Sequence, residues 1–350
     1  MPGTIDQLKW VYLTEAINEL KSPGTFLTQL LFRRRQSVPT ETIEVTTLVG
    51  DRLVAPFVRP GSEALMVPGL GRQVSTVTAP NIRIKRPFTP NELLFNRRYG
   101  TPVFVSAGTQ RAAIAEAIAL DLQYMRDSII NTIEWMVSQA LTGQIAYTVA
   151  DEESYTITFP KPVGNTVSLL TPDGWNEATG NPKVQFLQAK RIAFNAHGVP
   201  ITDAIMSQQA AAAFIDNPNV RADLSDTPNI RAGDLDLTAN FQDSGAIFLG
   251  RFSGIRVWEY SRSLDIDGVE TPLIRDNYVE FVSAIPQAEN RLYFGAIPDN
   301  FNLQGRFFQG EIFSKSWQEE DPPVVIALAH SRPLPVMRRP GTVVSMEVIV

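Results

Sequence analysis

Cysteine is absent from this chain of 350 residues, and histidine occurs only at His197 and His330. Without cysteine there is no disulfide framework, no thiolate nucleophile and no cysteine-ligated metal. Neither histidine belongs to an HxH or HExxH pattern, and the sequence contains no GxSxG nucleophile elbow and no GxxxxGK(S/T) phosphate loop. We therefore expect no catalytic residues, no cofactor and no metal site.

Long apolar runs are also missing. A run such as Val324 to Ala329 is far shorter than the ~20 residues that a helix needs to cross a bilayer. Residues 1–20 lack the basic start and apolar core of a signal peptide. Apolar residues make up 44% of the chain and charged residues 19%, which is a globular composition. The sequence predicts a soluble protein of the cytosol without membrane contact.

Charge is distributed unevenly along the chain. The net charge is −6, which argues against a duplex-DNA-binding protein as a whole, yet residues 51–100 carry eight basic and three acidic side chains, a local excess of +5. Opposite charges on different parts of one chain suit a lattice in which a basic arm lies on the acidic body of its neighbour. The alternative is a solvated flap whose charges keep it soluble. Charge alone leaves both interpretations open.

The basic stretch is predicted to form an extended excursion from Leu48 to Phe88, folded in half at Pro68–Gly71. Prolines in both limbs, about 52–67 and 72–86, indicate a ribbon at an edge and not the centre of a sheet. Two strands alone are marginally stable in water, so this hairpin needs another surface to lie on. That requirement points to assembly. The candidate contact residues between subunits are Arg52, Arg59, Gly69, Gly71, Arg72, Arg83, Lys85 and Arg86.

A long amphipathic helix is predicted over residues 106–142. Apolar residues recur at spacings of three and four, and the predicted buried face contains Ile118, Leu122, Ile129 and Ile133. Gly143 follows where a helix C-terminus favours glycine. The mixed spacing lacks a sustained heptad and so argues against a coiled coil. At 1.5 Å per residue this helix would be a rod of roughly 50 Å.

The remaining elements follow from periodicity and turn residues. Helices are expected over residues 4–21, 182–197 and 207–216, and a hairpin over 145–159. An apolar segment covers 26–32, and turn-rich or loop segments cover 161–182 and 217–242. Strands are expected at 42–49, 201–206, 246–260, 278–285, 291–296, 324–329 and 342–350. His197 before Gly198 is typical of a helix C-terminus, and Asp267-Gly268 of a hairpin turn.

The order of these parts resembles a known family. The stretches that carry the resemblance are Phe26-x-x-x-Leu30-x-Phe32, Thr46-x-Leu48-Val49-Gly50, Ala55-Pro56-Phe57-Val58-x-Pro60, Ala79-Pro80-Asn81-Ile82-Arg83-Ile84-Lys85, Pro87-Phe88-Thr89-Pro90 and Arg332-Pro333-Leu334-Pro335. An N-terminal arm, a basic loop, one long helix, a β-region and an α/β region follow one another. In this order the chain is similar to the major capsid proteins of tailed bacteriophages, and more narrowly to the phage-lambda capsid protein E type, which has the Hong Kong 97 capsid fold.

The resemblance implies an α+β fold, the tailed-phage major capsid fold. It divides the chain into an N-terminal arm (1–47), an extended E-loop (48–90), a P-domain with the long spine helix (91–174), an A-domain (175–320) and C-terminal strands that return to the P-domain or the A-domain (321–350). It also implies a non-enzymatic virion protein that assembles in the host cytoplasm, through hexamers and pentamers, into an icosahedral head. Expected partners are copies of itself, portal, scaffold and decoration proteins, and enclosed double-stranded DNA, held without sequence-specific binding.

Two alternatives remain at this point. An encapsulin-like cargo shell shares the fold but lies outside viruses, and neighbouring genes would distinguish it. An enzyme would need a site that the sequence does not reveal. Electron microscopy of purified protein separates assembly from enzymology in one step.

Overall fold

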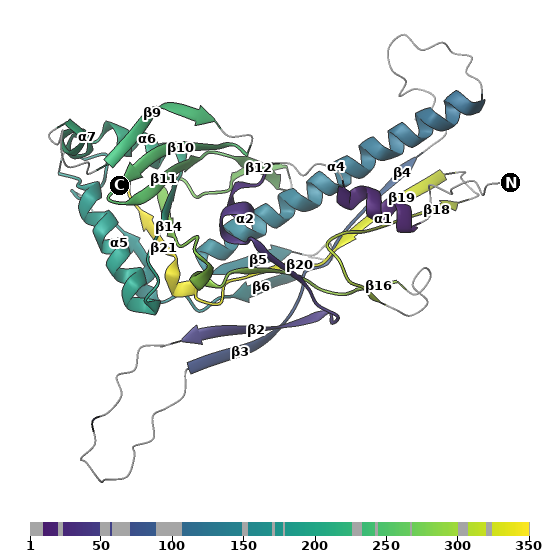
Figure 1. Cartoon of the computed structure of the whole chain (residues 1–350), viewed down its shortest axis with the longest axis horizontal. Coiled ribbons are helices and arrows are strands. Elements are labelled where there is room, and N and C mark those ends of the chain that lie inside the picture. The colour runs from purple at the N-terminus through teal and green to yellow at the C-terminus, as the bar shows by residue number, and fades with distance from the viewer. Residues whose placement is uncertain are drawn as a thin grey trace.

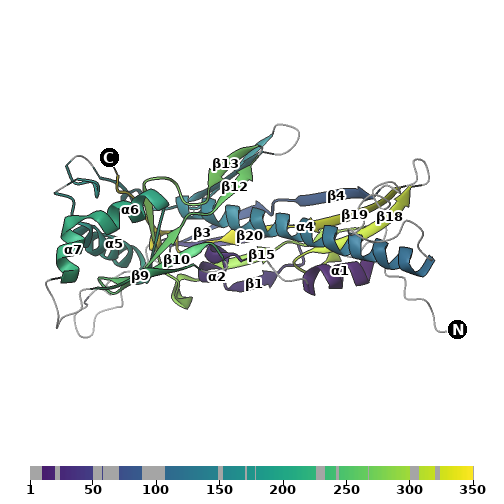
Figure 2. The same ribbon diagram turned by 90° about the horizontal axis from the view of Figure 1, so that it is seen from above.

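The molecule is elongated and flattened. The structure, a computed structural model, describes residues 10–19, 24–49, 57, 71–88, 107–148, 153–169, 172–177, 179–225, 233–241, 244–266, 268–299, 307–319 and 324–349. A helix-covered sheet forms one end, and a long helix extends toward the other end (Figure 1). Turned by 90°, the same chain is thin (Figure 2). A plate of this kind has large faces and edges for contacts with neighbours.

One helix spans the longer part of the molecule. α4 (Ala107–Thr142) has 36 residues and confirms the helix predicted over 106–142. Leu122, Ile129 and Ile133 are buried on its inner face, and the side chain of Ile118 lies outside the described residues. Gly143 follows the helix with a φ of +98°, a conformation that residues with a Cβ rarely adopt.

Small sheets surround α4 and form a first hydrophobic core with it. Two of them have three strands each, in the orders β1–β15–β20 and β18–β19–β4. Their strands are β1 (Arg34–Ser37), β15 (Arg291–Phe294), β20 (Pro333–Val336), β18 (Phe313–Glu319), β19 (Val324–Ser331) and β4 (Ile82–Phe88). Buried side chains of β15, β19, β20 and α4 belong to one continuous cluster, and Ile82 and Ile84 of β4 pack against it, which makes α4 the central element of this core.

The N-terminal segment adds two helices to the first core. They are α1 (Trp10–Glu19) and α2 (Phe26–Leu31), and both contribute buried apolar side chains. The apolar segment predicted at residues 26–32 is therefore α2, and it docks on the chain's own α4. Residues 4–9 and 20–21 of the helix predicted over 4–21 lie outside the described part of the chain.

A seven-stranded sheet forms the second core with three helices. Its order is β7 (Thr166–Ser168), β21 (Val344–Glu347), β14 (Tyr278–Val282), β8 (Asp203–Met206), β11 (Ile255–Tyr260), β10 (Ala246–Phe252) and β9 (Gly233–Phe241). The helices are α5 (Pro182–His197), α6 (Gln208–Asp216) and α7 (Pro218–Ser225). β8 is buried on both faces: Ala204 and Met206 lie in the second core, and Ile205 lies in the first. The central sheet thus joins the two cores.

Shorter pieces complete the fold. Two-stranded sheets are β2–β3 (Thr42–Val49, Gly71–Thr78), β5–β6 (Gln144–Thr148, Ser154–Thr158), β12–β13 (Ser263–Ile266, Val269–Pro272) and β16–β17 (Ile297–Pro298, Phe307–Phe308). The 3-10 helices are η1 (Val163–Asn165), η2 (Pro286–Ala288) and η3 (Pro340–Thr342). The hairpins predicted at 145–159 and around Asp267-Gly268 are confirmed by β5–β6 and β12–β13.

The extended hairpin differs from its prediction. β3 pairs with β2, so the flap uses residues 42–49 as one limb, and the predicted limb at 52–67 lies almost wholly outside the described residues. β4 leaves the flap altogether and pairs with β19 beside α4. The prediction of one basic hairpin over 48–90 is therefore wrong for residues 82–88. The sequence did not reveal this because Pro80 allows the chain to change direction in a region of uniform β-pattern.

Tertiary pairing also moves the predicted domain boundaries. β7 and β21, from outside the predicted A-domain (175–320), are strands of the seven-stranded sheet. In contrast, β15, from inside that range, contributes to the core around α4, and β18 pairs with β19 of that same core. The predicted loop at 217–242 contains α7 and β9 instead. Asn217 explains the start of α7, because its side-chain carbonyl accepts hydrogen bonds from the N–H groups of Asn219 (2.9 Å) and Val220 (3.4 Å).

A pair of leucines on α4 tests the role of its inner face. Leu122 is 3% exposed and Leu120 is 62% exposed. We expect Leu122→Ala to lower the free energy of unfolding by about 2–5 kcal/mol, because it removes buried methyl groups and leaves a cavity. Leu120→Ala, the same substitution on the outer face, should cost less than about 0.5 kcal/mol. Urea unfolding of the unassembled subunit measures both, and equal losses would contradict the assigned face.

Candidate assembly site

The predicted contact residues that the structure describes lie on two different elements. Arg52, Arg59 and Gly69 lie outside the described residues. Gly71 and Arg72 begin β3, where they pair with Val49 and Leu48 of β2. The other three, Arg83, Lys85 and Arg86, are on β4 in the body of the subunit. The structure therefore separates the predicted group into a flap and a body strand.

Within the described residues, the flap contacts the body at its base. Ile43 and Val45 of β2 are buried against the body, and the Arg338 guanidinium donates to the Thr46 carbonyl at 3.4 Å. Along β3, in contrast, the side chains of residues 73–76 are exposed, and Val74 is 59% exposed. Figure 1 shows β2 and β3 below the body, pointing away from α4. The outer part of this ribbon has no core of its own within the described residues.

β4 carries its basic residues along the spine helix. Arg83 and Lys85 are exposed, whereas Arg86 pairs with Asp121 of α4 at 3.2 Å. The Arg86 guanidinium also lies 5.9 Å from the centre of the Tyr124 ring, a cation–π contact. Arg86 is thus engaged within the subunit although its side chain is 43% exposed. Arg83 and Lys85 are exposed on the opposite face of β4.

A buried carboxylate holds the N-terminal arm. Glu134 of α4 is fully buried and accepts hydrogen bonds from the backbone N–H groups of Leu27 (2.7 Å) and Thr28 (3.0 Å) and from the Thr28 hydroxyl (2.5 Å). These N–H groups belong to the first turn of α2, where backbone N–H groups have no hydrogen-bond acceptor within the helix. Thr25, at the N-cap position, makes no side-chain cap. The spine helix therefore caps α2 in place of a local residue.

The same carboxylate reaches the seven-stranded sheet. The Tyr260 hydroxyl of β11 donates to Glu134 at 3.0 Å, and burial raises the pKa of Tyr260, as does the neighbouring Glu134 charge. Close by, Arg262 donates to the Gly24 carbonyl (2.6 Å) and to Asn131 of α4 (2.7 Å). Phe26 completes the contact, with its ring centre 5.3 Å from that of Tyr260. Arm, spine and sheet thus meet at one polar cluster with an aromatic cover.

The first helix of the arm is fixed by a second set of hydrogen bonds. The Thr14 hydroxyl of α1 donates to the Ser314 carbonyl of β18 (2.8 Å) and accepts from the Ser314 N–H (3.0 Å). Asn18 donates to the Ile312 carbonyl at 3.0 Å. The described part of the arm is therefore docked on its own subunit.

A second polar network connects the end of the spine to the sheet. Lys161 donates to the Leu141 carbonyl near the C-terminus of α4 (3.1 Å) and to the Ser345 hydroxyl of β21 (2.7 Å). Ser345 in turn donates to Glu280 of β14, which also accepts from Arg275 at 3.1 Å. Burial lowers the pKa of Lys161, and the Glu280 charge opposes that shift. The ammonium group at a helix C-terminus is also stabilised by the helix dipole.

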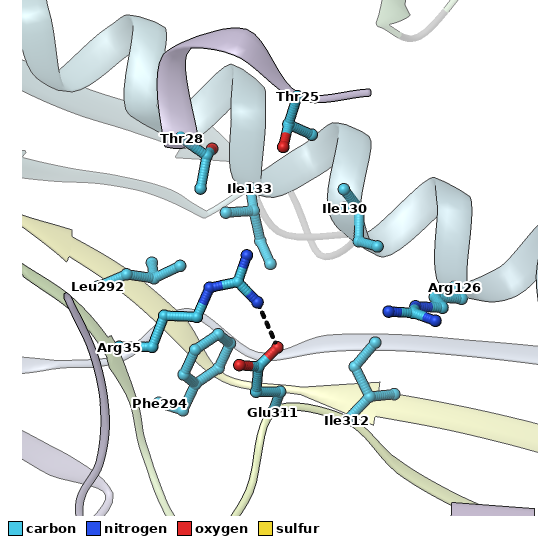
Figure 3. Close-up of a pocket in the computed structure, with 10 residues that line it drawn as sticks. All are labelled: Thr25, Thr28, Arg35, Arg126, Ile130, Ile133, Leu292, Phe294, Glu311 and Ile312. Carbon is cyan, nitrogen blue, oxygen red and sulfur yellow. Dashed lines mark hydrogen bonds and ion pairs between the residues drawn. The ribbon is translucent and has the colours of Figure 1, made fainter. Parts of the chain in front are cut away.

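The cavity beneath the arm is too small for a substrate. Figure 3 shows Arg35 bonded to Glu311, with the Arg126 guanidinium directed toward the same space. The cavity measures about 30 Å³, room for about one water molecule. The Arg35–Glu311 distance is 2.8 Å. Burial lowers the pKa of Arg126, and Glu311 counteracts this by favouring the charged form. The residues around this cavity therefore pack the arm against the body of the subunit.

The other residues that the sequence singled out for chemistry have structural roles in the described part of the chain. In this part of the chain, no three metal-ligating side chains come together. His197 ends α5 before Gly198 in the left-handed conformation, as its sequence predicted. Asp265 accepts from the Gly268 N–H at 2.8 Å, which stabilises a turn. None of the helices in the described ranges has the length and apolar character that a bilayer crossing requires.

Comparisons with known proteins identify the fold. Residues 9–348 match the family described as phage major capsid protein E. A crystal structure of a protein assigned as the capsid protein of an E. coli CFT073 prophage superposes with a TM-score of 0.70 at 17% identity, covering 97% of this chain and 99% of that one. The cyanophage A-1(L) capsid subunit gives 0.53 at 15% identity, covering 95% and 94%. A phage-related protein of Bordetella bronchiseptica RB50 gives 0.51 at 10% identity, covering 96% and 95%. Among curated sequences, none matches significantly.

The arm contact is tested by removing the Glu134 carboxylate. Glu134→Ala leaves two backbone N–H groups and the hydroxyls of Thr28 and Tyr260 buried without this acceptor, at about 1–3 kcal/mol for each group. We expect the free energy of unfolding to fall by at least ~3 kcal/mol, and protease to cut the arm near α2.

Glu311→Ala is the matched control for Glu134. Its ion pair with Arg35 joins side chains that are 40% and 45% exposed, so its loss should cost less than about 1 kcal/mol. Denaturant unfolding and limited proteolysis of the unassembled subunit compare the two variants. An arm that stays protease-resistant in Glu134→Ala would show that the carboxylate does not hold it.

His330 generates a prediction on acid stability. Burial, together with the smaller effect of the nearby charges of Arg83, Arg332 and Lys315, lowers the pKa of His330 to about 3, and the Asp299 charge opposes this shift. Between pH ~6.5 and this value the unfolded chain binds a proton that the folded chain does not, so acidification destabilises the fold. We expect a slope of up to ~1.4 kcal/mol per pH unit, which His330→Gln should reduce. Unfolding curves from pH 7 to 4 measure the slope, and an unchanged slope would assign the effect to other groups.

Proposed function

The chain belongs to the phage major capsid protein E family, and on that basis we propose that it forms the hexamers and pentamers of an icosahedral tailed-phage head. It is a structural protein of the virion, and it associates with copies of itself into a shell. The observation that supports the proposed arrangement is the flap β2–β3, which is anchored at its base and has exposed side chains along β3. A ribbon of this kind gains stability only by lying on another surface.

In this proposal the flap β2–β3 and the strand β4 both form contacts between neighbouring subunits. The flap, with Gly71 and Arg72 at the start of β3 and the predicted contacts Arg52, Arg59 and Gly69, lies on the next subunit. Arg83 and Lys85 of β4 provide a basic stripe on the subunit body. The overall charge of −6 leaves acidic surface for both to contact. Each contact is modest, and the shell repeats it in every subunit.

The domains of the proposed subunit follow the two cores. The core around α4 corresponds to the P-domain, and the core of the seven-stranded sheet corresponds to the A-domain, which would surround the symmetry axes. The A-domain then starts near β7 and includes β21. β15, which lies between them in the sequence, belongs to the P-domain. The N-terminal arm joins both domains through Glu134.

The proposal extends to partners and place of assembly. We expect assembly in the host cytoplasm, with portal and scaffold proteins and, in some heads, decoration proteins. Double-stranded DNA would be enclosed without sequence-specific contacts, because a net negative subunit gains little from phosphate binding. No enzymatic step is part of this function. Negative-stain electron microscopy of the purified protein is the direct test: closed shells support the proposal, and protein that stays monomeric at high concentration contradicts it.

Charge reversal on β4 tests the basic stripe. Arg83→Glu together with Lys85→Glu should leave the subunit folded, because both side chains are exposed, but should raise the protein concentration needed for shells. Exposed ion pairs contribute only ~0.2–1 kcal/mol each, and salt should raise the wild-type threshold in the same direction. The charge-conserving pair Arg83→Lys and Lys85→Arg is the control. Sedimentation measures the threshold, and equal thresholds for both pairs would remove β4 from the interface.

A further inference from the structure

We infer that one exposed face of α5 binds a groove on the next copy of the chain within a ring of subunits. The face consists of Val184, Leu187, Arg191 and Phe194 and is called the α5 stripe. The groove lies where α6 meets α7, and its lining includes Trp175, Glu177, Ala213, Asp216, Asn217 and Pro218. The inference rests on the proposed function, because it needs copies of the chain arranged in rings.

α5 has apolar side chains on two opposite faces. The inner face buries Phe186, Ala189 and Ala193 in the second core. On the outer face, Val184 is 55% exposed and Leu187 is 41% exposed. A surface helix normally carries polar residues on its outer face, and a contiguous exposed apolar patch marks an interaction site. The α5 stripe therefore fits a partner surface.

The stripe has a positive charge at its centre. Arg191 lies four residues after Leu187 and three before Phe194, so all three share one side of the helix. Arg191 is exposed, and within the described residues it forms no ion pair. Arginine among apolar side chains is typical of protein–protein interfaces, which are enriched in arginine and depleted of lysine. The complementary surface should be apolar with a carboxylate beside it.

The groove at the α6–α7 junction has this chemistry. It is open, with a volume of about 470 Å³. Ala213 and Pro218 supply apolar lining, and Glu177 and Asp216 supply carboxylates. Asp216 already pairs with Arg221 at 2.6 Å, which leaves Glu177 as the carboxylate for an incoming arginine.

The floor of the groove is rigid. Trp175 and Asn217 are each 1% exposed. The Asn217 side-chain amide donates to the carbonyls of Trp175 (3.0 Å) and Gly180 (3.1 Å), which ties the loop to the start of α7. The groove therefore exists before a partner arrives, and binding to a preformed site avoids an ordering cost.

The positions of the two surfaces allow a closed ring. Contacts around a rotation axis join two different surfaces of each subunit. In Figure 1, α5 runs along the lower edge of the sheet-bearing end, and α6 and α7 lie at its upper edge. One copy can thus offer its α5 stripe to one neighbour and its groove to the other.

Substitutions at Leu187 test the stripe. Leu187→Asp places a charge in the inferred contact and should raise the concentration needed for shells about tenfold or more, which corresponds to ~1.4 kcal/mol. Leu187→Met keeps apolar volume and should assemble normally. Val269→Asp makes the same kind of change at another exposed site, 64% exposed on β13, and should also assemble. Unfolding curves of the unassembled proteins verify that each variant is folded.

A charge exchange tests the pairing of the two surfaces. Arg191→Glu and Glu177→Arg should each block shells, and the double variant, which restores opposite charges at every contact, should regain them. An equal mixture of the two single variants can alternate around a ring with an even number of subunits but not around an odd one. We therefore expect the mixture to form sheets or tubes and few closed shells, as seen by electron microscopy.

The outcomes separate this inference from the proposed function. If the wild type forms shells while folded Leu187→Asp and Arg191→Glu do so equally well, the inference is wrong and the proposed function stands. If both single variants fail but the double variant is not rescued, the stripe binds a different surface and the pairing with the groove is overturned. A wild type without shells would overturn both.

Discussion

The fold depends on the carboxylate of Glu134. Among the residues that the structure describes, no cation bonds to it directly, and four hydrogen bonds from α2 and Tyr260 replace the water that it loses on burial. Each donor would also be costly to leave unpaired in this place. The N-terminal arm, the spine helix and the seven-stranded sheet are thus joined through one carboxylate. Any movement of one of them relative to the others must break hydrogen bonds that the interior cannot replace.

The cluster around Glu134 explains how a thin molecule remains one body. A flattened subunit has a small interior volume relative to its surface area. Its two cores are therefore small and need a connection between them. The central sheet supplies an apolar connection through β8, whose residues alternate between the cores. Glu134 and the Lys161–Ser345–Glu280 network supply polar ones at two places along α4. Polar groups fix geometry through hydrogen-bond direction, which apolar packing alone does not.

Three surfaces of the subunit carry side chains that pack in neither core. The flap β2–β3, the solvent-facing side of β4 and the outer face of α5 expose side chains that the subunit does not use internally. In a shell, each of these can be covered by another copy. The stability of the assembly then comes from repetition of modest contacts, while the stability of the subunit comes from its two cores. Variants can therefore separate the two quantities.

The sequence alone determined the elements with a strong local signal. The spine helix, α5 with Gly198 at its end and the hairpins β5–β6 and β12–β13 follow from apolar periodicity and turn residues, which act over a few positions. The order of elements also carried the resemblance to tailed-phage capsid proteins. Tertiary structure alone decided that β4 pairs with β19 and that Glu134 caps α2. These depend on residues more than a hundred positions apart, and a local pattern contains no information about which distant groups will meet.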